Sequence, residues 1–317
     1  MHDVVNLNGY DSHEDTAKLK PWIDPMYAGT SFSILNYDCN FWDLVKSDMV
    51  KVHVADISHL TRYKVHLSDG AVLPSNAILA HTGWKHVPPI KFLPEGIEVK
   101  LGIPHAHGEE QGFHDLVAKA DDEILHRLPA LRNEPVWNKN YTPLTAQRGI
   151  VCLDANTPYT PLTPWMLYRF MVPSSERFLR SRDTAFVGMV SNFSNIITSH
   201  IQGLWVSVYL AGKLVRDPAA ALGNKDAMRT VQYESVLHSR FGKWRYPVDW
   251  GQRPPSFVFD VIPYLDNLLQ DLGLNTQRKT GFKEVWSPYM PSDYRGLNDE
   301  WNAKFSIGAK LINKKIQ

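Results

Sequence analysis

Two short stretches of this sequence place a glycine at the end of an apolar run, next to small polar or aromatic side chains. The first is Ala80-His81-Thr82-Gly83-Trp84, and the second is Val187-Gly188, followed by Ser191 and Asn192. A glycine at the end of a strand lets the backbone approach a ligand where a Cβ atom would clash. Serine and asparagine before a helix cap amides whose positive end favours negative charge. Both stretches are therefore candidate ligand contacts.

Each stretch also has a purely structural interpretation. Trp84 fits an ordinary turn in which it packs as a core aromatic side chain, and residues 191–195 fit a helix N-cap that binds nothing. His81 has the right pKa range for an acid or base, although a packed histidine with a satisfied hydrogen bond is the more common case. His105 and His107 lie in a loop without cysteine neighbours, so we expect a solvated loop and no metal site. We assign no catalytic residue from the sequence.

The elements that must position these residues are typical of an α/β protein. Asp69-Gly70 predicts a β-hairpin between two short strands. The predicted strands are residues 49–57, 76–83 and 183–190, and the predicted helices are 113–128, 195–215, 225–241 and 261–273. Residues 163–181 predict one or two helical turns broken at Pro173.

Composition excludes several classes of function. The chain has 317 residues, 34 basic and 33 acidic side chains, and a net charge of +1. This balance gives no basic surface for nucleic acid or an acidic membrane. Polar residues interrupt the longest apolar run, 195–215, which argues against a membrane span. The chain has only two cysteines, Cys39 and Cys152, which indicates a reducing compartment. Its N-terminal residues show no apolar stretch of a secretory signal peptide, so we expect the cytoplasm.

Taken together, the motifs resemble the C-terminal half of the fungal flavin-containing monooxygenases, which are flavoproteins with two dinucleotide-binding domains. In that family a hairpin precedes a strand that ends in Ala-Thr-Gly-Tyr/Trp, so His81 is an insertion here. The helix after the second strand carries the family's Gln-x-x-Trp and Ala-Gly-Lys motifs, here Gln202, Trp205 and Ala211-Gly212-Lys213. Gln202, Trp205 and Tyr209 lie at helical spacing, and we expect them in the core.

The resemblance implies a fold, cofactors and a site. The fold would be the remnant of a two-domain flavoprotein, an incomplete Rossmann-like FAD domain with a β-hairpin insertion and a helical C-terminal part. Residues 1–48 would be a remnant of the NADPH-binding region, 49–242 the C-terminal portion of the FAD domain, and 243–317 an extension packing on it. FAD and NADPH are the implied cofactors. The implied FAD contacts are Thr82, Gly83, Trp84, Gly188, Ser191 and Asn192.

The family's two phosphate-binding fingerprints are absent. A Gly-x-Gly-x-x-Gly turn cradles a pyrophosphate at a helix N-terminus, yet no two of the 19 glycines are spaced i, i+2. We therefore expect an N-terminally truncated chain whose missing half comes from a second chain, from self-association or from nothing. The expected function is an oxidoreductase derived from NADPH- and O2-dependent oxygenation of a small organic molecule, in fungal specialised metabolism. The alternative is a cofactor-free protein on the same scaffold, either a subunit of a split enzyme or an isomerase or lyase.

Overall fold

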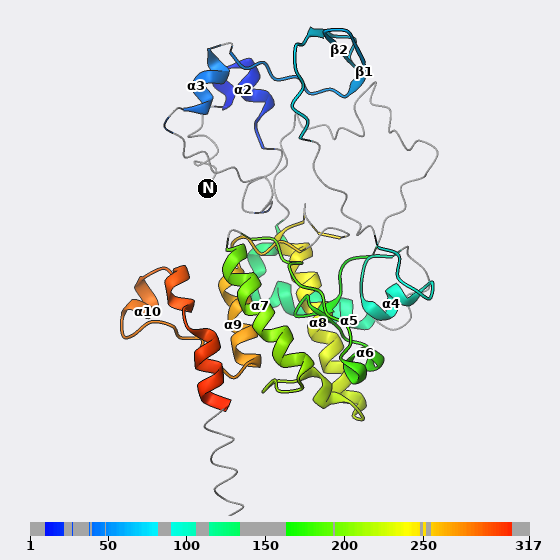
Figure 1. Cartoon of the computed structure of the whole chain (residues 1–317), viewed down its shortest axis with the longest axis vertical. Coiled ribbons are helices and arrows are strands. Elements are labelled where there is room, and N and C mark those ends of the chain that lie inside the picture. Colours follow the sequence, from blue (N-terminus) through cyan, green and yellow to red (C-terminus); the bar gives the residue numbers. More distant parts are fainter. Residues whose placement is uncertain are drawn as a thin grey trace, which may run out of the picture. The chain divides into compact units, whose positions relative to one another are not determined.

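The computed structural model describes residues 10–21, 27, 38, 40–47, 49–81, 90–105, 114–133, 163–192, 194–247, 250–251 and 255–305 (Figure 1). The chain forms two compact units. Unit 1 contains residues 1–85 and 133–160, and unit 2 contains residues 86–132 and 161–317. Helices and small sheets make up both units, which agrees with the predicted α/β class.

Short helices open unit 1. They are η1 (Tyr10–Ser12), α2 (Glu14–Lys18) and α3 (Phe41–Lys46). The Thr16 hydroxyl donates to the Tyr10 carbonyl oxygen at 2.6 Å, which ties η1 to α2. Tyr10 meets the Trp42 ring edge-on, with 4.8 Å between ring centroids, and so brings α3 onto this pair. Aromatic packing therefore holds together elements that are too short to be stable alone.

An antiparallel sheet of three strands follows in unit 1. Its strands are β1 (Ile57–Thr61), β2 (Lys64–Leu67) and β3 (Val72–Pro74), in the order β1-β2-β3. The predicted hairpin is confirmed, since β2 pairs with β3 and Gly70 takes a φ of +91° in the turn. The strand predicted over 49–57 is wrong except at its last residue. Ile57 pairs with Leu67, the end of β2, so the residues before Ile57 have no partner strand.

The strand predicted over 76–83 is also wrong in its described part. Residues 76–81 form no strand and are exposed, and Leu79 is 99% exposed. An apolar strand of this kind is stable when neighbouring strands flank it and both faces of the sheet are covered. Among the described residues no strand lies beside it, so the apolar run stays in solvent.

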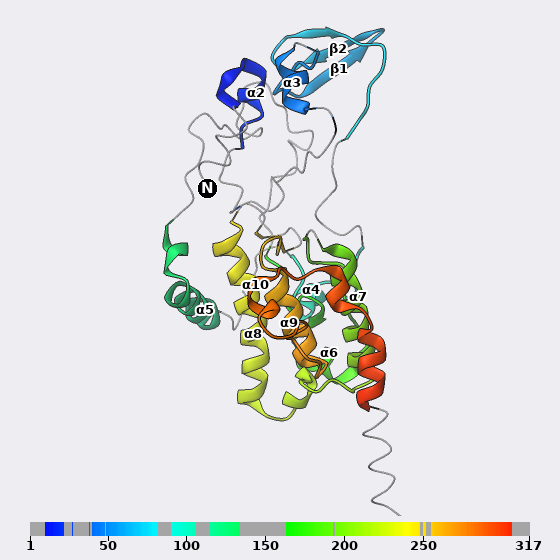
Figure 2. The same ribbon diagram turned by 90° about the vertical axis from the view of Figure 1, so that its left-hand side faces the viewer.

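Unit 2 is mainly helical, and Figure 2 gives a second view of it. The four predicted helices are confirmed as α5 (His114–Arg127), α7 (Asn195–Leu210), α8 (Lys225–Arg245) and α9 (Val261–Asp271). Helix α7 ends before the predicted boundary because Gly212 takes a φ of +67°, a left-handed cap that stops the helix. The shorter elements are α4 (Ile97–Leu101), η4 (Pro129–Arg132), α6 (Glu176–Ser181), η6 (Pro218–Ala221), α10 (Lys283–Trp286) and η7 (Pro291–Tyr294).

A two-stranded hairpin replaces the helical turns predicted before Pro173. Strands β4 (Leu167–Tyr168) and β5 (Val172–Pro173) are joined by Arg169 and Phe170, which have φ values of +52° and +55°. Left-handed conformation at both central residues is the pattern of the hairpin turn that usually carries asparagine and glycine. The sequence lacks those residues here, so the turn depends on tertiary contacts of Arg169 and Phe170 to hold an unfavourable backbone.

Residues 183–190 do not form the predicted strand either. The Phe186 N–H donates to the Met171 carbonyl oxygen at 2.7 Å, which pins the segment to the hairpin at one point. Val187 is half exposed, so the segment lies on the surface of the unit. As with residues 76–81, the described chain offers no neighbouring strand with which this apolar run could form a ladder.

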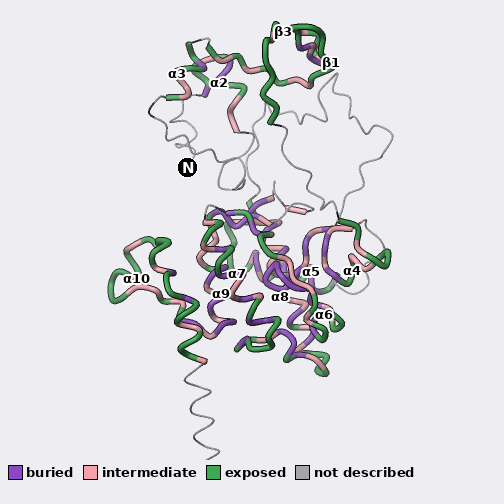
Figure 3. Tube along the Cα trace, in the orientation of Figure 1, coloured by how far each residue is buried: buried purple, intermediate pink, exposed green. Residues whose placement is uncertain are grey.

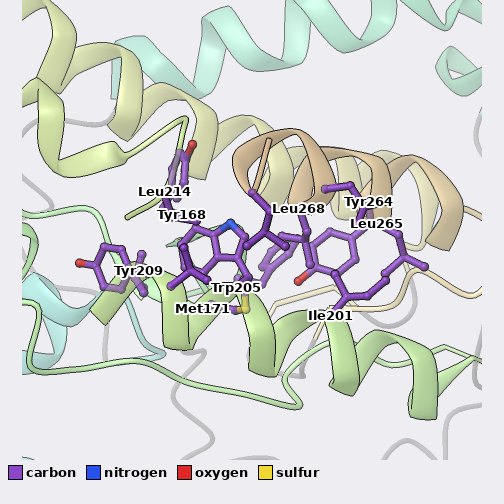
Figure 4. Close-up of a cluster of buried hydrophobic side chains, with 14 of the residues drawn as sticks. Tyr168, Met171, Ile201, Trp205, Tyr209, Leu214, Tyr264, Leu265 and Leu268 are labelled. Atoms are coloured by element: carbon purple, nitrogen blue, oxygen red, sulfur yellow. The ribbon is translucent and has the colours of Figure 1, made fainter. Parts of the chain in front are cut away.

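The main hydrophobic core of unit 2 lies between α7, α9 and the β4–β5 hairpin. Figure 4 shows Trp205 at its centre, with Tyr209, Met171 and Leu268 around it. Figure 3 shows the same helices as purple on their inner faces. A second contact joins α5 to α8, where Leu116 and Ala120 pack on Val236, as the periodicity of residues 113–128 predicts. In the described part of the chain, no helix is long and apolar enough to cross a membrane.

Candidate cofactor-contact site

Three of the predicted contact residues, Gly188, Ser191 and Asn192, lie together just before helix α7. Gly188 has a φ of +79°, a conformation that favours glycine, and no atom lies within 4 Å of the position that a Cβ would occupy. Its outer side is therefore open. The structure thus places Gly188 in an open, left-handed turn and not at the end of the buried strand that the sequence predicts.

Ser191 and Asn192 are held by bonds within the chain. The Ser191 N–H donates to the Pro255 carbonyl oxygen and its carbonyl oxygen accepts from the Phe257 N–H, both at 2.9 Å, in an isolated parallel bridge. Asn192 is buried, and its amide donates to the Thr198 hydroxyl at 3.1 Å. Ser191 and Asn192 therefore fix the entry into α7, and the Asn192 side chain is committed to that role.

The first turn of α7 retains unsatisfied amides. Its N-cap residue, Ser194, makes no side-chain capping bond. Within the described chain, no acceptor is found for the N–H groups of Asn195 and Ile196, and the Ile196 side chain is 88% exposed. Because unpaired amides and the helix dipole make this end positive, it favours a negatively charged group.

A buried hydrogen-bond relay connects Gly188 to the core. The Gly188 N–H donates to Oε1 of Gln202 at 3.1 Å, and Nε2 of Gln202 donates to the Tyr264 hydroxyl at 2.8 Å. That hydroxyl donates to the Arg169 carbonyl oxygen at 2.9 Å. Burial raises the pKa of Tyr264 well above its usual value, so the phenol stays protonated and keeps its donor role. The position of the Gly188 turn is therefore set by helices α7 and α9.

A buried ion pair closes the relay. Nε of Arg169 donates to Oδ2 of Asp271 at 2.8 Å, a second guanidinium N–H donates to Oδ1 at 3.1 Å, and Trp205 Nε1 donates to the same carboxylate. Glu234 pairs with Arg169 at 2.8 Å from a more exposed position. Although burial alone lowers the pKa of Arg169, the hydrogen bonds to Asp271 raise it overall. The guanidinium is therefore a permanent charge in the core.

These contacts confirm that Gln202, Trp205 and Tyr209 are core residues. All three are fully buried, and the Trp205 and Tyr209 rings stack with 5.4 Å between centroids. Sequence reasoning did not find the link from Gln202 to Gly188 and Tyr264. The signal was present, because a glutamine inside an otherwise apolar helix stripe must find partners when it is buried.

The first predicted motif cannot be placed. Thr82, Gly83 and Trp84 lie outside the described residues, and they belong to unit 1, whereas the Gly188 turn belongs to unit 2. His81 is described and exposed, so its expected packing against a sheet is wrong. Nδ1 of His105 donates to the Ile103 carbonyl oxygen at 2.8 Å and lies 3.0 Å from the Thr163 hydroxyl, and His107 lies outside the described residues. Within the described chain, no three histidine, cysteine or acidic side chains are grouped to hold a metal ion.

Comparison with known proteins identifies the relatives of this chain. An FAD-dependent monooxygenase of Aspergillus sclerotiorum is 31% identical over 93% of this chain and 48% of its own length. A second, from Aspergillus nomiae, is 30% identical over 86% of this chain and 43% of its own. A third, from Aspergillus versicolor, is 28% identical over 93% and 43% respectively. No protein-family model matches the chain, and no solved structure is significantly similar to it.

The chain is similar to about half of a fungal FAD-dependent monooxygenase. This finding confirms the resemblance that the motifs indicated. The chain spans about half the length of the curated relatives that it matches.

The described residues fit one part of FAD and not another. The open Gly188 turn and the unpaired amides of α7 suit the edge of a flavin ring on which negative charge collects. The pyrophosphate needs closely spaced glycines at a helix N-terminus, and the chain has no two glycines at i, i+2. The residues of this chain therefore suit the flavin ring of FAD but not its pyrophosphate.

The relay yields a stability prediction. Replacing Gln202 with methionine keeps the volume but leaves the Gly188 N–H without its acceptor and the Tyr264 hydroxyl without its donor, although that hydroxyl still donates to Arg169. We expect a loss of about 2 kcal/mol in the free energy of unfolding, with faster amide exchange at Gly188 measured by NMR. Ser207→Ala is the matched control on the same helix, since Ser207 is exposed and bonds only to its own helix at Gly203. Equal effects of the two variants would contradict the relay.

Proposed function

We propose that this chain is part of an FAD-dependent monooxygenase-like oxidoreductase and supplies a segment that faces the flavin. The observation that carries this proposal is the similarity to several fungal FAD-dependent monooxygenases over about nine tenths of the chain. The open turn at Gly188 and the unpaired amides of α7 support it.

Each part of the segment has a distinct task in this proposal. Gly188 gives the ring access to the backbone, and Ser191 and Asn192 hold the start of α7 in place. The amides of Asn195 and Ile196 stabilise negative charge on the reduced ring. When bound, the flavin supplies the redox chemistry, with NADPH as the hydride source and O2 as the oxygen source for a small organic substrate. FAD contacts are also proposed for Thr82, Gly83 and Trp84.

The remaining predictions belong to the same proposal. The fold is a remnant of a two-domain flavoprotein, with residues 1–48, 49–242 and 243–317 as its parts. The 317 residues carry no phosphate fingerprint, so the rest of the FAD site would lie outside them, and a second chain or a second copy is the proposed source. The setting is fungal specialised metabolism in the cytoplasm.

A second candidate is a cofactor-free protein on this scaffold. One observation favours it: Asn192 and the Ser191 backbone are satisfied within the chain and need no ligand. In this case the chain is a partner subunit, or an isomerase or lyase that uses the old substrate cavity.

The visible absorbance of the purified chain, with and without added FAD, separates the two candidates. A flavin band, with near-stoichiometric flavin released on denaturation, supports the flavoprotein. A colourless, folded chain that does not bind FAD rules out autonomous flavin binding and favours the cofactor-free candidate.

The site itself is tested by the flavin's reduction potential. Ile196→Asp places a negative charge at the first turn of α7, so we expect a lower potential because the anionic reduced ring is destabilised. Val215→Asp adds the same charge at an exposed position beyond the other end of α7 and serves as the control. Equal potentials in both variants would place the flavin elsewhere.

A further inference from the structure

An exposed apolar surface surrounds the short helix α10 in unit 2. Phe282, Val285 and Trp286 are 86%, 77% and 82% exposed, and Met290 is 53% exposed. The first three are spaced i, i+3 and i+4, so they share one face of the helix. We call these four residues the α10 patch. Figure 3 shows the α10 segment mostly in green, the colour of exposed residues, with stretches of intermediate burial in pink.

The loop that carries the α10 patch is held rigidly from behind. Lys279 donates to the Ser287 hydroxyl at 3.0 Å and to the Pro288 carbonyl oxygen at 2.9 Å, and its backbone N–H donates to Glu284. Arg278 forms an ion pair with Glu300 at 2.8 Å. A frayed loop would expose apolar side chains incidentally, whereas these bonds fix the loop and present the side chains outward. Ordered aromatic side chains of this kind are typical of binding surfaces.

We propose that the α10 patch is a two-fold interface between two copies of this chain. A two-fold interface brings the same surface together twice, so it must complement itself. An apolar patch does so without needing an opposite charge. This inference is independent of flavin binding.

The charges near the α10 patch permit two copies to approach. The Glu284 carboxylate accepts bonds from Lys279 and from Tyr289 of its own loop, and the Lys279 ammonium pairs with Asp293 at 3.2 Å. The Lys279 and Asp293 charges offset each other within the copy, and the Glu284 carboxylate is held inside its own loop by the Lys279 backbone N–H and the Tyr289 hydroxyl, so these three groups add little like-charge repulsion to the contact. The net charge of +1 for the whole chain adds little long-range repulsion.

The area also matches what a dimer needs. An aromatic side chain presents about 150–250 Å², so Phe282 and Trp286 together present roughly 300–500 Å². With Val285 and Met290, one copy offers roughly 500 Å², and two copies bury roughly 1,000 Å², the threshold for a specific interface. The α10 patch alone therefore reaches the lower end of stable dimers.

Sedimentation velocity over a wide range of concentrations tests the proposal on the full chain. We expect a reversible dimer, and Trp286→Ser and Phe282→Ser should each weaken dimerisation at least tenfold. Leu79→Ser is the control, because Leu79 is the most exposed apolar side chain described and lies outside the α10 patch. A monomer at all concentrations would overturn the proposal, as would a dimer that neither patch variant weakens.

A covalent test does not depend on weakening the fold. With Cys39 and Cys152 replaced by serine, Val285→Cys should form a disulfide-linked dimer under mild oxidation, because Val285 lies between Phe282 and Trp286 on the helix face that would meet its copy across the two-fold axis. A cysteine at Leu79 in the same background should not. Equal cross-linking at both positions would indicate random collision and overturn the interface.

Discussion

Replacing Asp271 with asparagine will lower the free energy of unfolding by about 3 kcal/mol. The substitution preserves shape but removes the negative charge that faces Arg169, whose guanidinium is buried and donates two hydrogen bonds to that carboxylate. Removing one partner of a buried ion pair lowers stability by more than the intact pair contributes, because the other charge stays buried without a counter-charge. Urea unfolding followed by tryptophan fluorescence measures the loss.

The matched control is Glu234→Gln, because Glu234 pairs with the same guanidinium from a side chain that is 36% exposed. We expect a loss of at most about 1 kcal/mol, since solvent screens this pair. If both variants lost the same amount, the energetic distinction between the buried and the exposed carboxylate would be wrong.

Replacing His238 with phenylalanine will remove a large part of the acid sensitivity of unit 2. Nδ1 of His238 is inaccessible to solvent and has no hydrogen-bond partner among the described residues, although the residue as a whole is only partly buried. Its ring lies 5.9 Å from that of Phe170. Burial, together with the positive charge of Arg169, lowers the pKa of His238 to about 3.

The sign of the effect follows from proton binding. Between pH 6.5 and about pH 3, the unfolded chain carries a proton on His238 and the folded chain does not. The contribution of His238 to stability is therefore complete above pH 6.5 and is lost as the pH falls. Because part of the residue reaches solvent, we expect a difference of about 2–3 kcal/mol across this range.

Unfolding free energies at pH 7 and pH 4 provide the measurement. The loss between the two should be smaller by about that amount in His238→Phe than in the unchanged protein. His200→Phe is the control, because His200 is exposed on α7. An unchanged pH slope in His238→Phe would show that His238 titrates normally.

The sequence predicted the elements whose signal is local. The helical periodicity of residues 113–128, 225–241 and 261–273 depends only on near neighbours, and so does the Asp69-Gly70 turn; all four formed as expected. The start of α7 was also found, because serine and asparagine favour positions at a helix N-terminus.

The predictions that failed depend on distant partners. Residues 76–81 and 183–190 have the apolar composition of buried strands, but a strand needs a ladder, and the described chain provides none for them. The turn at Arg169 and Phe170 failed for the opposite reason. Its left-handed residues carry no local signal, and it is held by contacts with Asp271 and Tyr264 about a hundred positions later.

That separation has a consequence for how the chain is made. While the ribosome has released the hairpin of Arg169 but not yet helix α9, the guanidinium has no Asp271 and the Trp205 cluster has no covering helix. Contacts between residues so far apart form slowly, and apolar surface stays open in the meantime. The core of unit 2 therefore closes late in synthesis, and nascent chains that stop before α9 are the forms in greatest need of a chaperone.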